Sequence, residues 1–149
     1  MKISISFILR LIVAIILIQS LYFKFTGHSE AVHIFSTLGV EPWGRIGLGC
    51  VELIVGLLLL FPKTHIKGSF LAVGILLGAL GAHLFTPLGI VVRWEGQSDG
   101  GQLFTMAAIG FLFALINILI VASKTKTSLF QLIQKEFMLN LLRTQNNTM

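Results

Sequence analysis

Four long runs of apolar residues, separated by shorter polar segments, dominate the hydrophobic pattern of this chain. The runs cover approximately Ile3–Phe23, Trp43–Phe61, Gly68–Phe85 and Gln102–Ala122. Each holds about 18–21 residues, enough to cross a hydrocarbon core of about 30 Å as an α-helix that rises about 1.5 Å per residue. We therefore predict an all-α protein built on an integral membrane four-helix bundle.

The polar segments predict two further helices. Between the first two runs, Glu30–Leu38 has apolar residues at helical spacing, which predicts a short helix in the outer loop that ends near Gly39. After the fourth run, Ser128–Leu142 alternates apolar with polar residues and predicts an amphipathic helix on the membrane surface. We expect a four-helix domain over residues 1–123 and a cytoplasmic, partly disordered amphipathic tail over residues 124–149.

Composition supports a membrane protein. Hydrophobic residues make up 55% of the chain and charged residues only 11%, whereas soluble domains have about 25% charged residues. The net charge is +5. The basic residues that produce it lie mainly in short loops and the tail, so we expect the lipid bilayer as the partner and no nucleic acid.

The distribution of charge predicts the orientation. Four crossings place both termini on the same side of the membrane. That side collects Lys2, Lys63, Lys67, Lys124, Lys126, Lys135 and Arg143 against the single acid Glu136. Because positive residues concentrate in cytoplasmic segments, we expect both termini in the cytoplasm of a cell with a bacterial-type (inner) membrane.

Two charged residues interrupt the apolar runs. Glu52 lies near the middle of the second run, and Arg10 lies at a similar depth in the first. A charge at the centre of a membrane helix costs about 2.5–3.5 kcal/mol, so each needs a partner. Since neighbouring helices run antiparallel, we expect Arg10 and Glu52 to pair, either as a lock between helices or as an anchor or proton donor for a ligand. If the second helix is shifted along the membrane normal from this position, Glu52 pairs with Lys24 instead.

Three more residues complete the candidate ligand-binding or proton-relay site. Lys24 follows Arg10 by fourteen residues and shares its stripe of the first helix, and Arg45 shares the stripe of Glu52. His83, near the outer end of the third run, either donates to a carbonyl or carries a proton.

We predict no metal site. His28 and His33 are five residues apart, a poor spacing for one helical face, and no third ligand is evident. The single cysteine, Cys50, excludes an internal disulfide and a C-x-x-C motif.

Small residues line the third run as Gly74-x-x-x-Gly78-x-x-x-Ala82. This spacing lets helix backbones approach closely in lipid. It favours tight packing of the third helix and permits a homo-oligomer.

Over roughly Phe7–Ala122 the chain resembles the DoxX family of small four-helix membrane proteins. The matching pieces are Arg10, the exit S-L-Y-F-K-F-T-G with Lys24 and Gly27, E-L-I-V-G-L-L-L-L with Glu52 and Gly56, G-A-L-G-A-H with His83, and the D-G-G of Asp99–Gly101.

The family takes its name from a subunit of a thiosulfate:quinone oxidoreductase. The resemblance therefore implies a quinone- or lipid-binding subunit of a membrane redox or oxidative-stress complex, with redox partner subunits, a quinone and no covalent cofactor. Arg10 and Glu52 would polarise the oxygens of the ligand or relay a proton, with Lys24 and His83 at the outer mouth. An enzymatic role would exist only within a quinone-linked oxidoreductase.

Two other functions are compatible with the sequence. One is a small-solute transporter or exporter, although we find neither inverted repeats nor a proline inside a helix. The other is a purely structural assembly subunit. The space beside Glu52 distinguishes them: a pocket open to lipid favours ligand binding, one open to water favours transport, and a close-packed pair favours a structural role.

Overall fold

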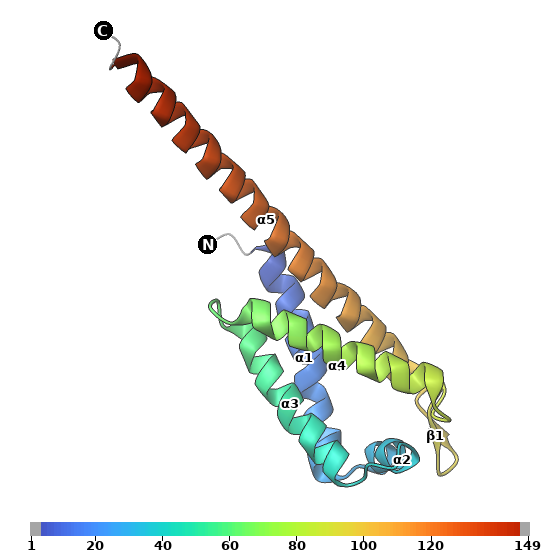
Figure 1. Cartoon of the computed structure of the whole chain (residues 1–149). Coiled ribbons are helices and arrows are strands. Elements are labelled where there is room, and N and C mark those ends of the chain that lie inside the picture. The colour runs from blue at the N-terminus through green and yellow to red at the C-terminus, as the bar shows by residue number, and fades with distance from the viewer. Residues whose placement is uncertain (1–3, 147–149) are drawn as a thin grey trace. The chain divides into compact units, whose positions relative to one another are not determined.

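The structure is a computed structural model that describes residues 4–146 of the chain, without the side chains of residues 129, 132, 133 and 136–146. This part of the chain is mainly helical. The helices in this part are α1 (Ile5–Thr26), α2 (Ser29–Thr37), α3 (Trp43–Leu60), α4 (His65–Phe85) and α5 (Gln102–Asn146). Two short strands, β1 (Arg93–Trp94) and β2 (Gln97–Ser98), form an antiparallel hairpin between α4 and α5 (Figure 1). The predicted all-α class and the short helix after the first apolar run are confirmed.

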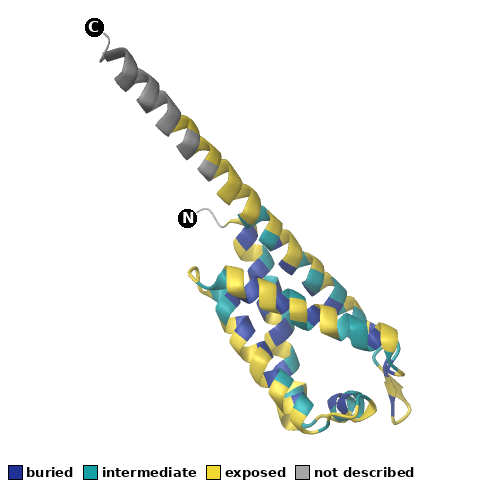
Figure 2. Cartoon of the chain, in the orientation of Figure 1, coloured by how far each residue is buried: buried dark blue, intermediate teal, exposed yellow. Residues whose placement is uncertain are grey.

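Four helices have the length and hydropathy that a membrane crossing requires. They are α1, α3, α4 and the segment Gln102–Ser128 of α5. Exposed residues occur along each of them (Figure 2), and these include large apolar side chains such as Ile15, Ile54 and Leu77. Apolar side chains on an outer surface suit contact with lipid, so the helices indicate a multi-pass membrane protein.

The start of α4 and the course of α5 differ from the prediction. Residues 65–67, which precede the predicted start of the third run at Gly68, form the first turn of α4, in which Gly68 N donates to Thr64 O at 3.0 Å. The predicted separate amphipathic helix is wrong, because α5 is continuous to Asn146. The polar segment after Ala122 contains neither glycine nor proline. Its Ser123, Thr125 and Thr127 hydroxyls donate to carbonyls three or four residues earlier, so these polar groups are satisfied within the helix.

The chain divides into two compact units, Met1–Ile118 and Leu119–Met149, and each is considered by itself. The predicted tail, residues 124–149, lies within the second unit. Its last residues, 147–149, lie outside the described part, as does the predicted helix start at Ile3.

In the first unit, the apolar core lies between α1, α3, α4 and the beginning of α5. Its buried members are Val13, Ala14, Leu17, Val55, Leu59, Ala72, Leu76, Ala107 and Ala114. Alanine and valine predominate over aromatic residues, and such small side chains let helices pack closely where lipid supplies no hydrophobic force between them.

The glycines that bring helices together are not those of the predicted stripe. A Cβ atom on Gly68 would lie 3.0 Å from Leu59 N, because the start of α4 meets the backbone of α3 there. By contrast, a Cβ atom on Gly74 or Gly78 would have nothing within 4 Å. Among the described residues, Gly74 and Gly78 therefore do not bring α4 close to another helix, contrary to the prediction for the stripe, whereas Ala82 packs against the cluster of Leu88, Val92 and Trp94.

Asp99 organises the segment between α4 and α5. Its Oδ1 accepts hydrogen bonds from Val92 N at 2.8 Å and Gly101 N at 2.9 Å, and its Oδ2 accepts one from Leu103 N at 3.1 Å. An acidic residue that binds the first amides of a helix satisfies groups without an intrahelical partner and suits the positive end of the helix dipole. Asp99 thus starts α5 and fixes the hairpin before it, with Trp94 packed among Leu88 and Val92.

Candidate functional site

The antiparallel pair of α1 and α3 carries most of the predicted site. Two glycines of α3 permit close contact: a Cβ atom on Gly56 would lie 2.9 Å from the Ile18 side chain, and one on Gly49 would lie 3.0 Å from the Phe25 ring. The buried face of α3 also contains Arg45 and Glu52. Arg45 and Glu52, which were predicted to share one stripe of this helix, thus both lie on its buried face.

Glu52 is neutralised by Lys24. The Lys24 Nζ atom lies 2.8 Å from Glu52 Oε2, with the two side chains only 13% and 7% exposed. The Ser20 hydroxyl donates to the same carboxylate oxygen at 2.8 Å and accepts a hydrogen bond from Lys24 Nζ at 3.0 Å. We call these three residues the Lys24–Ser20–Glu52 cluster. Its charges cancel, and its polar groups bind one another.

The predicted pair of Arg10 and Glu52 is wrong, and the alternative with Lys24 is the one present. The reason is the tilt of helical side chains toward the N-terminus of their own helix. In an antiparallel pair, Lys24 and Glu52 tilt toward each other, whereas Arg10 tilts away from Glu52. Arg10 reaches Leu59 on α3, which is seven residues, or about 10 Å, beyond Glu52 along the helix.

Arg10 binds carbonyl oxygens instead of a carboxylate. Its Nε donates to Ser6 O and its Nη1 to Leu59 O, both at 3.2 Å, and the guanidinium carbon lies 5.4 Å from the centroid of the Phe7 ring. The side chain is buried, with the residue 8% exposed. Among the described side chains, no carboxylate lies within salt-bridge distance of it.

Arg45 is committed to the end of α1. It forms an ion pair with Glu41 at 2.7 Å and donates from Nη1 to Lys24 O. That carbonyl belongs to the last turn of α1, where carbonyls lack intrahelical partners and the helix dipole is negative. Gly27 ends α1 with φ +67°, beside the Arg45 guanidinium. Arg10 caps α3 at Leu59 O in the same way, so each helix ends against an arginine of the other.

His83 lies apart from these residues. Its Nδ1 is 2.6 Å from Gly89 O, so this nitrogen carries a proton and donates to the carbonyl. The ring is buried and contacts Phe104 edge to face at 5.8 Å between centroids. Of the two roles predicted for His83, the structure contains the hydrogen bond to a carbonyl. Of the five predicted residues, Lys24, Glu52 and Arg45 are linked by direct contacts, whereas Arg10 and His83 lie in separate ones.

A second polar network joins α1, α4 and α5 next to Arg10. Ser6 Oγ donates to Asn117 Oδ1 at 2.6 Å, Asn117 Nδ2 donates to Ser69 Oγ at 2.8 Å, and Ser69 Oγ donates to His65 O at 2.9 Å. Nδ1 of His65 is buried and has no hydrogen-bond partner among the described atoms. Sequence reasoning did not connect Asn117 or His65 with Arg10.

A pocket near α2 was missed by sequence reasoning. It has a volume of about 410 Å³ and is lined by Gly27, Ser29, Val32, His33, Ser36, Trp94 and Glu95. Ser29, His33 and Ser36 share one face of α2, a spacing that was visible in the sequence. The proximity of Trp94 and Glu95 was not visible, because it depends on how the hairpin packs.

Glu30 on α2 carries a shifted pKa. Burial raises the pKa of Glu30 above its usual 4.5, the Asp99 carboxylate raises it further, and His28 opposes the rise. The folded protein therefore binds the Glu30 proton more tightly than the unfolded chain does. The contribution of Glu30 to the free energy of unfolding is largest below pH 4.5 and is lost as the pH rises through the raised pKa.

We therefore expect Glu30→Gln to flatten the pH dependence of unfolding. Thermal unfolding of the wild type and of Glu30→Gln in mild detergent, measured from pH 4 to 7, should show stability falling with pH more steeply in the wild type. Groups that do not interact with Glu30 titrate alike in both proteins, so they do not contribute to the difference between the curves. Parallel curves would contradict the stated role of Glu30.

These contacts define the class as an all-helical, multi-pass membrane protein with an ionic cluster and a polar network buried between its helices. No family model, no curated protein and no solved structure matches the chain.

Proposed function

We propose that this chain is a DoxX-type subunit of a bacterial-type cytoplasmic membrane that binds a quinone or another lipid-like molecule beside Arg10. Its four spans form an integral membrane bundle with both termini in the cytoplasm, and the basic residues near the termini support this orientation. Its partners are the lipid bilayer, redox subunits of an oxidative-stress or quinone-linked complex and a second copy of the chain.

The observation that carries the proposal is the buried, unneutralised charge of Arg10. The guanidinium stays charged at any physiological pH, and its contacts are two carbonyl oxygens and the Phe7 ring. The nearby network leads to His65, whose Nδ1 has no partner. A quinone carbonyl or a lipid phosphate would supply the electron-rich oxygen that the Arg10 guanidinium binds.

The Lys24–Ser20–Glu52 cluster has a different part in this proposal. It is closed on itself, so it holds α1 against α3 and leaves ligand binding to Arg10. The same closure favours the second candidate function, a purely structural assembly subunit. In that case Arg10 would act only as a cap of α3.

Substitution of Arg10 separates the two functions. We expect Arg10→Met to reduce the quinone or lipid that co-purifies per protein by about 10- to 100-fold, because a hydrogen bond to a charged group contributes about 1.5–3 kcal/mol. The protein is purified in mild detergent, extracted with organic solvent and analysed by mass spectrometry, which also identifies the ligand.

The matched control is the double variant Lys24→Met with Glu52→Met, which should keep the ligand. If circular dichroism and size exclusion show that Arg10→Met is not folded, Arg10→Lys, which retains the charge, is tested in its place. A folded Arg10→Met protein with the ligand content of the wild type would leave only the structural function.

A further inference from the structure

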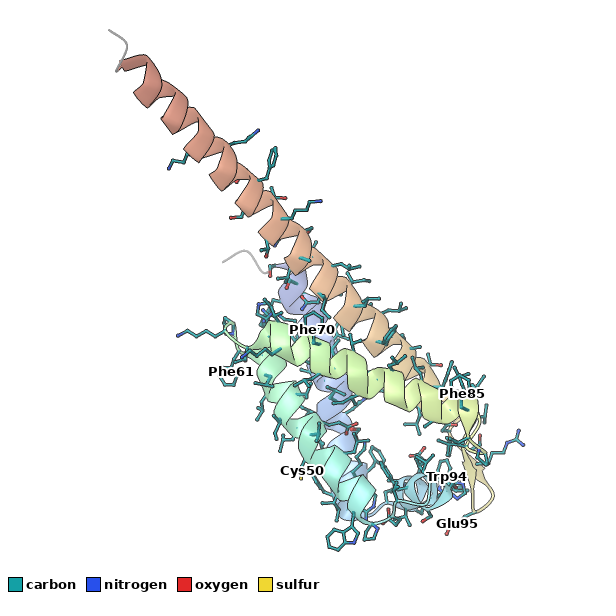
Figure 3. All side chains as sticks on the ribbon, viewed as in Figure 1. Cys50, Phe61, Phe70, Phe85, Trp94 and Glu95 are labelled. Atoms are coloured by element: carbon teal, nitrogen blue, oxygen red, sulfur yellow. The ribbon has the colours of Figure 1, made fainter. Side chains whose placement is uncertain are left out.

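The short helix α2 docks on the segment between α4 and α5 next to the carboxylate of Asp99. It contacts β1, and its Ile34 packs against the apolar cluster that contains Val92 and Trp94. Figure 3 shows Trp94 at the hairpin, beside α2. Leu103, at the start of α5, packs against the same cluster. The Asp99 carboxylate binds the N–H groups of Val92 and Leu103, so it lies at the edge of the surface that α2 covers.

Glu30 brings a second carboxylate to this edge. It precedes Ile34 by four residues, so the two side chains lie one turn apart on the same side of α2. Glu30 is partly buried, and no lysine or arginine among the described side chains lies within salt-bridge distance of it. Burial and the Asp99 carboxylate both raise the pKa of Glu30, and His28 at the start of α2 opposes them. Ionisation of Glu30 therefore disfavours the docked position of α2.

The cations on the elements around α2 do not offset this repulsion. The helix contacts α1, α3 and β1. Lys24 on α1 and Arg45 on α3 are ion-paired with other carboxylates. Arg93 on β1 is exposed and forms no ion pair with a described carboxylate. Glu30 thus depends on protonation, and not on a fixed partner, to lose its charge.

The α2 helix is suited to local opening. It has nine residues, of which Ala31 and Phe35 are buried. A pocket of about 410 Å³ is lined by residues of α2 and of the hairpin, so the contact between them is incomplete. Segments with few buried apolar contacts open at a lower free energy than the whole protein does. The α2 helix can therefore leave the hairpin while the bundle stays folded.

We propose that Glu30 is a pH-sensitive latch that holds α2 on the hairpin when it is protonated and releases α2 when it is ionised. Release separates Glu30 from Asp99, hydrates its carboxylate and uncovers the apolar cluster with Val92 and Trp94. The proton is exchanged with bulk water. The latch involves none of the contacts of Arg10, so it is independent of the ligand proposed there.

The experiment measures amide hydrogen exchange of the full chain in mild detergent from pH 4 to 7. Mass spectrometry follows peptides from residues 29–37 of α2 and from α1 and α3, with rates corrected for the intrinsic pH dependence of exchange. In the wild type we expect the protection of α2 to fall by up to about tenfold per pH unit between pH 4.5 and the raised pKa of Glu30. In Glu30→Gln the fall should be much smaller, and α1 and α3 should stay protected in both proteins.

Two further variants test the assignment. Glu95→Gln is the matched control, because it removes an exposed carboxylate of the same hairpin, and it should respond to pH as the wild type does. Asp99→Asn removes the like charge and keeps one oxygen that can accept from Val92 N, so it should reduce the fall in α2 protection. If Glu30→Gln does not fold, the comparison of the wild type with Asp99→Asn decides.

Fluorescence supplies a second readout. The chain has two tryptophans, and Trp43→Phe leaves Trp94 as the only one. Trp94 is 8% exposed, so its emission should move to longer wavelengths as the pH rises and α2 leaves, and Glu30→Gln should suppress this shift.

Three results would overturn the proposal. They are an equal pH dependence of α2 protection in the wild type and Glu30→Gln, an effect of Glu95→Gln as large as that of Glu30→Gln, and a simultaneous loss of protection in α1, α2 and α3. The last result would show global unfolding in place of a local release.

Discussion

Replacing Lys24 with methionine is expected to destabilise the protein by about 3–5 kcal/mol, because it leaves the Glu52 carboxylate buried without its ion-pair partner. Glu52→Met should cost a similar amount by leaving Lys24 unpaired. Both side chains are well buried, at 13% and 7% exposure, so solvent screens them little. Unfolding of the purified variants in mild detergent by added dodecyl sulfate, followed by circular dichroism, measures the loss.

The double variant Lys24→Met with Glu52→Met provides the internal control. Replacing a whole buried ion pair by apolar residues is often neutral or stabilising, whereas breaking one half is costly. We therefore expect the double variant to lie within about 1 kcal/mol of the wild type, with a coupling energy close in magnitude to the sum of the two single costs. Additive single effects would show that the cluster does not act as a pair.

Replacing Gly68 with alanine is expected to destabilise the protein by about 1–3 kcal/mol, because the new methyl group overpacks the contact between α4 and α3. The added Cβ atom would lie 3.0 Å from Leu59 N and 3.1 Å from Leu58 C. These are backbone atoms, which cannot move aside as the end of a side chain can, so one helix must shift.

Gly74→Ala is the matched control on the same helix. Its Cβ atom would have nothing within 4 Å, and alanine is favoured over glycine in a helix by about 1 kcal/mol, so this variant should be as stable as the wild type or more stable. The same unfolding assay applies. Equal effects of the two substitutions would show that the close approach at Gly68 contributes nothing.

The sequence predicted the helices well because their apolar runs are long and their ends are marked. Pro62 follows α3, and Gly27 ends α1 in a left-handed conformation. The sequence did not predict that α5 is continuous, because the polar residues after Ala122 suggested a break in the helix. There, serine and threonine hydroxyls donate to backbone carbonyls of the same helix. Composition alone does not distinguish such a helical segment from a polar loop.

The candidate site was only partly accessible from sequence. Spacing placed Lys24 and Glu52 on facing stripes, but the choice between Arg10 and Lys24 as partner depended on side-chain tilt as well as depth. The pocket at Trp94 could not be predicted, because it arises from a hairpin whose position depends on the hydrogen bonds of Asp99. Periodicity describes the faces of single helices, and it carries no information about such loop packing.

The reciprocal arginine caps have a consequence for biogenesis. Arg45 binds a carbonyl at the C-terminal end of α1, and Arg10 binds one at the C-terminal end of α3, so neither contact can form until both helices have left the ribosome. A nascent chain that stops after α1 would present an arginine to the translocon with no carbonyl from α3 to receive it. The two segments are therefore expected to leave the translocon for lipid together, as a helical hairpin, and not one after the other.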